Sequence, residues 1–236
     1  GMFAGLASDT INGAIFSVGG PAVQKIMGVV NKIGFLTDFI GLVGSGASSP
    51  KNALKIKLGD YNLDENDFGH GVLQGAVRHS WSEVSNIVGK GWSYIRNFKG
   101  EVDRVDYFGG NTFVTNEDSD YSQGVTLGNY INMDIYKGKV VGNFRDYVKY
   151  DPMFMHEYGH TFDSDALGPF YLFVIGIPSA ISASKFSSGK YPDYRHVEYW
   201  TERRANNFGS SYFARFGVDW RTQLYRGQTL ISLYPL

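Results

Sequence analysis

The pentapeptide His156-Glu157-Tyr158-Gly159-His160 constrains this chain more than any other feature, because its HExxH spacing suits metal binding on a helix. Two histidines four residues apart lie on one face of an α-helix, one turn above the other, so both imidazoles can reach the same ion. The intervening Glu157 then points toward a water molecule at that ion. The pattern predicts a metal-dependent peptidase, and the alternative is a buried helix with two hydrogen-bonded histidines.

The residues that flank the pentapeptide favour a buried helix. Tyr150-Asp151-Pro152 is typical of a turn followed by a helix start, since proline is well tolerated in the first helical turn. Bulky apolar side chains follow at Phe154, Met155 and Phe162. We therefore expect the histidines to lie on a helix that is packed inside the protein.

Composition narrows the kind of metal site. The chain has 236 residues and no cysteine, so a zinc ion, the predicted cofactor, could be held only by histidine and carboxylate groups. The formal net charge is −1 and no run of Lys or Arg is present, so we expect no nucleic-acid partner. A charged fraction of 19% beside an aromatic fraction of 16% indicates a folded chain.

A catalytic zinc ion has three protein ligands and one open position, so a third ligand must lie outside the pentapeptide. The extended metzincin pattern would place it ten residues after His156, at Ala166, and alanine cannot bind a metal. Asp163 and Asp165 follow His160 too closely on the same helix to reach the third vertex easily. We expect these aspartates to act as helix-end groups or to support the ligands from behind.

The segment from His196 to Asn206 holds the remaining ligand candidates. Its spacing is compatible with a helix that places Glu202 and Asn206 on one face, one turn apart. With Glu202 as the ligand, Asn206 could support the second ring nitrogen of a ligating histidine. Glu198, one turn earlier on that face, is the alternative ligand. A further reading makes Glu202 a surface residue paired with a neighbouring arginine.

Two resemblances extend this reading. HEYGH followed by WTERRAN resembles the gluzincin branch of zinc metallopeptidases, in which a glutamate on a later helix completes the site. The resemblance implies that His156, His160 and Glu202 are the zinc ligands and that Glu157 is the general base. Asn206 stands where an aspartate is common, and the insertion between the two helices is longer than in compact members. Those departures put the substrate class in doubt more than metal binding.

The second resemblance covers roughly residues 102–213. It is to the C-terminal domains of bacterial Rhs/YD-repeat cell-surface proteins, through VDYFGGNTFV, GVTLGNYIN, HEYGHTFDS, LGPFYLFVIGIPS and YWTERRANNFGSSYF. It implies a domain of a longer bacterial protein that is secreted or displayed at the cell surface. Nothing at the N-terminus has the basic stretch and cleavage site of a signal peptide.

The predicted fold is α+β and zincin-like: a small antiparallel or mixed sheet precedes the HExxH helix, and a helical C-terminal part carries the third ligand. Strands are expected at residues 54–58, at 102–107 and 112–115 around a Gly-Gly-Asn turn, and at 124–133, where a sheet edge facing the metal helix could pair with a peptide. A long helix is expected over 72–98, with 89–91 as the place for a break. Residues 166–184 are expected to form a buried loop and a short helix, with a membrane-dipping element as the alternative.

Two domains are expected, a Gly-rich apolar segment at residues 1–50 and the zincin-like domain at 51–236. Val23, Ile26, Met27, Val30 and Ile33 have helical spacing, and residues 44–50 are expected to be a linker. The segment either packs as helices on the main domain or contacts a membrane. Its charges and the Gly19-Gly20-Pro21 sequence argue against a spanning helix.

The predicted reaction is hydrolysis of a peptide or protein substrate, with zinc activating water and Glu157 transferring the proton. His196, Tyr199 and Tyr212 are candidate donors to the oxyanion because they lie near the predicted ligand helix. Two alternatives are a non-catalytic module that keeps the fold for structure or partner binding, and a toxin-like effector whose residues 3–46 assist membrane passage. The two remaining histidines, His70 and His79, are expected to be ordinary surface or core residues.

Overall fold

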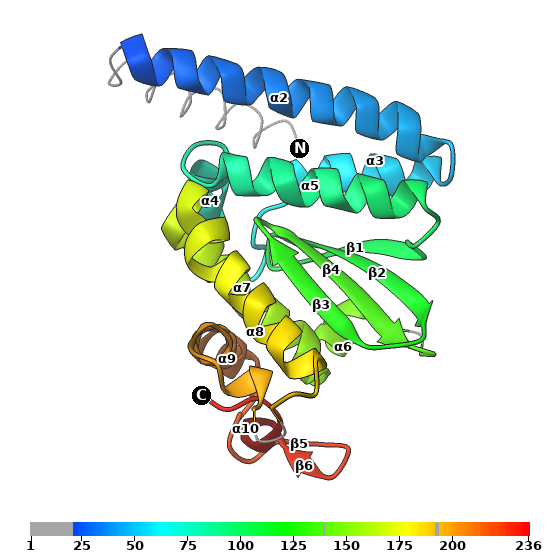
Figure 1. Ribbon diagram of the computed structural model, residues 1–236, viewed down its shortest axis with the longest axis vertical. Helices are drawn as coiled ribbons and strands as arrows, with labels where there is room; N and C mark the ends of the chain where they lie inside the picture. The colour runs from blue at the N-terminus through cyan, green and yellow to red at the C-terminus, as the bar shows by residue number, and fades with distance from the viewer. Residues whose placement is uncertain (1–20, 139, 192–193) are drawn as a thin grey trace. The chain divides into compact units, whose positions relative to one another are not determined.

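The computed structural model describes residues 21–138, 140–191 and 194–236. They belong to two compact units, Gly1–Lys139 and Val140–Leu236, and the described chain has an α+β fold (Figure 1). The boundary between the two compact units lies after Lys139, whereas the sequence predicts a domain boundary after residue 50. Of the predicted N-terminal segment, residues 1–20 lie outside the described part of the chain.

The first unit contains a four-stranded mixed sheet in the order β1-β2-β4-β3, formed by β1 (Arg104–Phe108), β2 (Asn111–Ser119), β3 (Gln123–Leu127) and β4 (Tyr130–Tyr136). The predicted hairpin between β1 and β2 is confirmed, and its turn uses Gly109 and Gly110 at φ 55° and 80°. The prediction of one strand over 124–133 is wrong. A turn at Gly128 (φ 63°) divides this stretch into the antiparallel β3 and β4, and β4 runs parallel to β2.

The prediction of a strand at residues 54–58 is wrong, because these residues form the second half of helix α3 (Pro50–Leu58). Ser49 caps the helix, since its side chain accepts a hydrogen bond from the Asn52 amide, and Pro50 is the first helical residue. Ile56 is fully buried, whereas Leu54 and Leu58 are about half exposed. The alternation of Lys with Leu and Ile therefore arises on a short helix. The linker predicted at residues 44–50 is limited to residues 47–49, because the preceding helix ends at Gly46 and α3 begins at Pro50.

The long helix predicted over 72–98 consists of two helices, α4 (Phe68–Arg78) and α5 (Glu83–Phe98), with η1 (Gly59–Tyr61) preceding them. The break lies at residues 79–82, and α5 continues through Gly89-Lys90-Gly91, where the sequence suggested a break. Gly89 is needed for packing rather than bending. A Cβ at this position would lie 2.0 Å from the Leu127 carbonyl oxygen at the end of β3.

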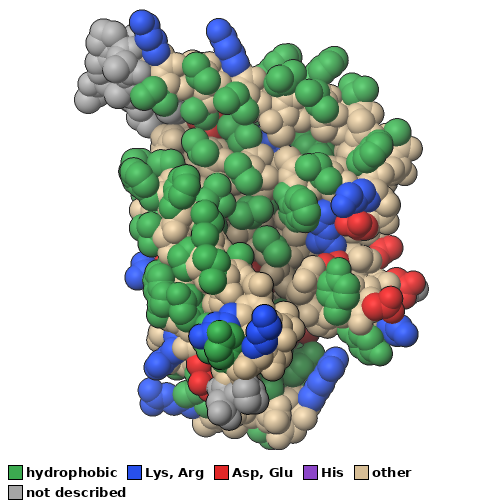
Figure 2. All heavy atoms as spheres, in the orientation of Figure 1, with side chains coloured by type: hydrophobic (Ala, Val, Ile, Leu, Met, Phe, Trp, Pro, Cys, Tyr) green, Lys and Arg blue, Asp and Glu red, His purple; other side chains and the backbone are tan. Residues whose placement is uncertain are grey.

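Helix α2 (Pro21–Gly46) packs lengthwise on α5 within the first unit. Gly41 permits this contact, because a Cβ there would overlap the ring of Tyr94. Exposed apolar side chains lie along α2: Ile26, Val29, Ile33, Phe35, Leu36, Phe39, Ile40 and Val43. Hydrophobic side chains, drawn in green, are spread over the visible face of the molecule in Figure 2. Of the helices expected in this segment, the described residues contain one, α2, which packs within the first unit.

The second unit is mainly helical. Its elements are α6 (Phe144–Tyr150), α7 (Pro152–Leu167), η2 (Gly168–Phe170), the π-helix η3 (Leu172–Gly176), α8 (Ile177–Ser187), η4 (His196–Glu198), α9 (Trp200–Phe213), η5 (Ala214–Phe216), β5 (Leu224–Tyr225), β6 (Gln228–Thr229) and α10 (Leu230–Leu233). Aromatic rings from α7 and α9 form much of its core. The ring centroids of Tyr158 and Tyr212 are 4.4 Å apart.

Residues 166–184 do not form the predicted buried loop. They are helical almost throughout, with Tyr171 and Ile175 buried and Phe173, Ile177 and Ile181 exposed. Taken singly, the described helices all fall short of the length and hydropathy that a membrane span requires. Pro152–Phe170 and Leu172–Ser187, bent by 117° at their junction, meet that criterion only as a pair.

Candidate metal centre

Helix α7 carries the HExxH pentapeptide and begins where the sequence predicts. The Asp151 carboxylate accepts hydrogen bonds from the backbone amides of Met153 (2.9 Å) and Phe154 (3.4 Å), and Pro152 occupies the first helical position. These contacts satisfy amides that have no partner within the helix. The pentapeptide lies in the buried middle of α7, and the exposed fractions of His156, Glu157 and His160 are only 5–6%.

The second helix of the site, α9, crosses α7 at very short range. Gly209 on α9 faces the Met155 carbonyl, and a Cβ on Gly209 would lie 2.6 Å from that oxygen. The helices can therefore approach until their backbones touch. This proximity lets a glutamate side chain on α9 reach the two histidines on α7.

His156, His160 and Glu202 form a buried cluster whose potential ligand atoms all lie within 4.8 Å of one another. One carboxylate oxygen of Glu202, Oε2, is 3.2 Å from His156 Nε2 and 3.4 Å from His160 Nε2. The other oxygen, Oε1, accepts a hydrogen bond of 2.6 Å from the Thr201 hydroxyl. Glu202 is 2% exposed, which contradicts its alternative reading as a surface residue.

Glu198 does not belong to the cluster, and its placement on the same helical face as Glu202 is wrong. It lies in the 3-10 turn η4, because α9 begins only at Trp200. Its side chain is half exposed and pairs with Arg195 at 3.0 Å. Of the two glutamates considered as third ligand, the structure brings only Glu202 to the histidines.

Asn206 supports His156 in the way its spacing from Glu202 predicts. Its Oδ1 lies 2.6 Å from His156 Nδ1, and its side chain is fully buried. An amide oxygen can only accept, so Nδ1 of His156 carries a proton, and Nε2 is the nitrogen that faces Glu202. A bound metal ion would take the place of any proton on Nε2, which leaves the Nδ1–H tautomer that a metal ligand requires.

The aspartates after His160 have other roles. Asp163 is fully buried and forms an ion pair with Arg204, which ties the end of α7 to α9. Burial raises the pKa of the Asp163 carboxyl, and the Arg204 guanidinium opposes that shift. Asp165 lies in the last turn of α7 and is not a member of the cluster. Both therefore fit the expectation that they are not ligands.

The charges of the cluster depend on one another. Burial disfavours the ionised Glu202, but hydrogen bonds from His156 and His160 outweigh it and hold the pKa of its carboxyl far below the usual range. Burial likewise works against a charge on His160, while the contact with Glu202 raises the pKa of its imidazole. The anionic oxygen between two imidazole nitrogens thus attracts positive charge. A divalent cation that replaced the shared protons would suit this donor set.

His196 approaches the cluster from η4. Its Nε2 is 3.5 Å from Glu202 Oε2, and its Nδ1 is 2.8 Å from the Ser182 hydroxyl of α8. Ser182 is in turn 2.7 Å from the Tyr194 hydroxyl. Burial lowers the pKa of the His196 imidazole, with the charge of Glu202 opposing that shift.

The two tyrosines predicted as oxyanion donors are placed differently. Tyr199 is the residue before α9, and its ring neighbours Trp200 at 6.1 Å between centroids. The ring of Tyr212 packs in the aromatic core with Tyr158 and Phe213, and its part as a donor stays a prediction. The side chain of His196 lies 3.5 Å from Glu202 Oε2, whereas Tyr199 contacts Glu202 through its backbone carbonyl, which accepts a hydrogen bond from the Glu202 amide at 3.0 Å.

Sequence reasoning missed several neighbours of the cluster. Tyr171 is fully buried at the start of η3, where burial and the charge of Glu157 raise its pKa well above the usual value. The ring of Tyr234 lies 5.1 Å from that of His156, and the Pro235 carbonyl accepts a hydrogen bond from Asn206. No local pattern marks these residues, because they reach the site only through folding.

The histidines outside the second unit have ordinary partners. His70 Nδ1 lies 2.8 Å from Asp64, and His79 Nε2 lies 3.1 Å from the Asp60 carbonyl. Within the described ranges, His156, His160 and Glu202 are the one group of three or more His, Cys, Asp or Glu side chains placed to hold a metal ion.

Comparisons with known proteins identify no relative. No protein-family model matches the chain, and neither the curated proteins nor the solved structures compared with it give a match.

Proposed function

We propose that this chain is a zinc metallopeptidase of the gluzincin type, with a zincin-like catalytic fold. The observation that carries the proposal is the buried cluster of His156, His160 and Glu202, in which two imidazole nitrogens face one carboxylate oxygen. Two histidines and a glutamate are a ligand set typical of catalytic zinc. Glu157 lies between the two histidines on the same helix, as a general base for this chemistry requires.

Each residue of the site has a distinct part in this proposal. His156, His160 and Glu202 hold the ion, and Asn206 keeps the His156 ring in the required orientation. A bound zinc ion would supply Lewis acidity, which polarises a substrate carbonyl and lowers the pKa of a water molecule to about 7. Glu157 accepts the proton from the attacking water and then donates it to the leaving amine.

His196 is the best-placed candidate to stabilise negative charge on the substrate. Its Nε2 faces the cluster and its Nδ1 is held by Ser182, so the ring has a defined orientation. A donor that is already oriented needs no reorganisation when charge develops on the carbonyl oxygen. The substrate class in this proposal is a peptide or protein, and the resemblance to Rhs/YD-repeat proteins suggests a secreted or surface-displayed setting.

The near-complete burial of the cluster favours one second candidate, a non-catalytic module in which the metal has a structural role. Structural zinc sites are closed, whereas catalytic sites keep one position open to substrate. The side chains of His156 and His160 are only 6–7% exposed, so a substrate would need a path to the ion. Activity of the zinc-loaded protein separates the two candidates.

The test is hydrolysis of a quenched-fluorescent peptide library by the zinc-loaded chain and by Glu157→Gln. The proposal expects cleavage by the wild type and a loss of about 10²–10⁴-fold in the variant, with zinc retained by both. Equal cleavage by both proteins would remove Glu157 from the mechanism. A zinc-loaded wild type that cleaves no member of the library would favour the structural module.

A further inference from the structure

Three consecutive backbone carbonyls at the C-terminal segment Tyr234–Leu236 each accept a hydrogen bond from a buried or helical side chain of the second unit. Trp220 Nε1 donates to the Tyr234 carbonyl at 2.9 Å, and Asn206 Nδ2 donates to that of Pro235 at 2.6 Å. Arg203 Nε donates to the carbonyl of Leu236 at 2.7 Å. The segment is therefore fixed along α9, directly beside the residue that supports His156.

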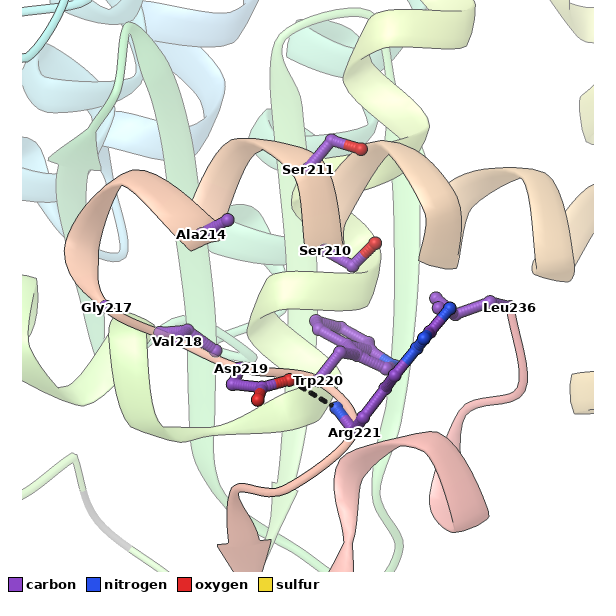
Figure 3. Close-up of a pocket in the computed structure, with 9 residues that line it drawn as sticks. All are labelled: Ser210, Ser211, Ala214, Gly217, Val218, Asp219, Trp220, Arg221 and Leu236. Atoms are coloured by element: carbon purple, nitrogen blue, oxygen red, sulfur yellow. Dashed lines mark hydrogen bonds between the residues drawn. The ribbon is translucent and has the colours of Figure 1, made fainter.

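Figure 3 shows where Trp220 and Leu236 of this arrangement lie. Trp220 and Leu236 both line a cavity of about 500 Å³ next to α9. Ser210 and Ser211 form part of the wall of this cavity. Trp220 itself is 3% exposed. The segment is thus held by its three hydrogen bonds, one of them from a buried indole.

The contact with Pro235 determines which way the Asn206 amide points. An amide has one accepting oxygen and one donating nitrogen, so the two ends are not equivalent. In the opposite orientation, Oδ1 would lie at 2.6 Å from the Pro235 carbonyl oxygen, and two acceptors would face each other. The nitrogen would then face His156 Nδ1 and force that ring to accept. Only the observed orientation leaves the Nε2 lone pair of His156 free for an ion.

An aspartate would not need this constraint, because both of its oxygens accept. The C-terminal segment therefore complements the asparagine. The Pro235 carbonyl turns the Asn206 amide so that an accepting oxygen faces His156, whereas an aspartate would present an accepting oxygen in either orientation. With aspartate at position 206, the same carbonyl would instead face a carboxylate oxygen, which is repulsive.

We infer that the segment Tyr234–Leu236 is a positioning element of the metal centre, which sets the metal-binding tautomer of His156 by orienting Asn206. The inference rests on the proposed zinc centre. It predicts that the effect of removing the segment on zinc affinity depends on the residue at position 206.

The test compares zinc affinity, by competition with a chromophoric chelator, in four proteins: the wild type, a chain that ends at Leu233, Asn206→Asp, and the combination of both changes. Outer contacts to a ligating histidine are typically worth 10–100-fold in metal affinity. We expect the shortened chain to lose at least about tenfold when asparagine is retained at position 206. In the Asn206→Asp protein the same shortening should leave affinity unchanged or raise it, because a repulsive contact is removed.

Trp220→Phe provides a second way to release the segment without shortening the chain, since it removes the donor to the Tyr234 carbonyl together with part of a buried ring. Its effect on zinc affinity should depend on the residue at position 206 in the same way, but to a smaller degree. Thermal melting of the metal-free proteins reports whether each variant is folded. Equal losses in the wild-type and Asn206→Asp backgrounds, or no loss in either, would overturn the inference while leaving the zinc centre intact. A wild type that takes up no zinc would overturn the proposed function, and this inference with it.

Discussion

Gly159 on α7 faces the backbone carbonyl of Ala205 on α9 so closely that a Cβ on Gly159 would lie 2.0 Å from that oxygen. The fourth residue of the HExxH pentapeptide is thus the point at which the ligand helices touch. Gly159→Ala should destabilise the metal-free protein by about 3 kcal/mol, because a backbone atom cannot move away as a side chain can. Urea denaturation measures this change, and zinc affinity should fall with it as Glu202 moves away from the histidines.

Gly176→Ala is the matched control for that substitution. Gly176 ends the π-helix η3, and a Cβ there would meet its nearest atom at 3.7 Å, an ordinary contact. The free energy of unfolding should change by less than about 1 kcal/mol. Equal losses of unfolding free energy in the two variants would show that the close helix contact at Gly159 does not cause the destabilisation.

Glu202→Ala should abolish stoichiometric zinc binding, because it removes the only carboxylate oxygen that faces both histidines within the described part of the chain. Glu198→Ala is the control. That side chain is half exposed and pairs with Arg195, so its removal should leave the zinc content unchanged. Elemental analysis of both purified proteins decides between them. Loss of zinc from the Glu198 variant alone would contradict the assignment.

His196→Ala should reduce kcat for peptide hydrolysis by about 10²–10³-fold while the protein keeps its zinc, since the loss of one oxyanion donor has this typical cost. Ser182→Ala should have a smaller effect in the same direction, because it removes the 2.8 Å contact that orients the ring. Steady-state kinetics with zinc-loaded protein check both. A His196 variant that loses zinc along with activity would instead indicate a fourth ligand.

Glu83 in the first unit should make stability depend on pH. Its carboxyl lines a cavity of about 350 Å³ together with Asp60 and Lys90, and burial raises its pKa to about 7. The folded state holds the proton more tightly than the unfolded state, whose pKa is near 4.5. Its contribution to stability is therefore fully present below pH ~4.5 and is lost as the pH rises through ~7.

Glu83→Gln should remove that dependence. At pH 8 the variant should be more stable than the wild type by about 1 kcal/mol, a value reduced because solvent partly screens the carboxyl. At pH 4 the two proteins should be equal. Urea denaturation in the presence of a chelator measures both, and Glu101→Gln, at a half-exposed position beside Lys99, controls for the loss of a negative charge. A constant difference across this pH range would contradict the assignment.

Local sequence patterns predicted the parts of the site in which the spacing of two residues along one helix determines whether they share a face. His156 and His160 share a face because they are four residues apart, and Glu202 and Asn206 do so for the same reason. Glu198 was misplaced because α9 begins only at Trp200, a boundary that the spacing of the segment does not reveal. Tyr234 and Pro235 were missed because their contacts join residues far apart in the chain.

The same distinction applies to the fold. The hairpin between β1 and β2 was predictable from its glycine turn, whereas the parallel pairing of β2 with β4 depends on contacts that no local pattern encodes. The strand predicted at residues 54–58 failed for another reason. Ser49 and Pro50 are a helix start, and these two residues outweigh an alternation only five residues long.

The measurement that tests the central claim most directly is zinc K-edge X-ray absorption of the chain loaded with one equivalent of zinc. The proposed centre predicts one tightly bound ion per chain with two imidazole nitrogens and carboxylate oxygen in its first coordination sphere, at roughly 2.0–2.2 Å. Substitution of His160 by alanine should remove one imidazole contribution from the spectrum. A protein that retains no zinc, or a spectrum without imidazole scattering, would contradict the account.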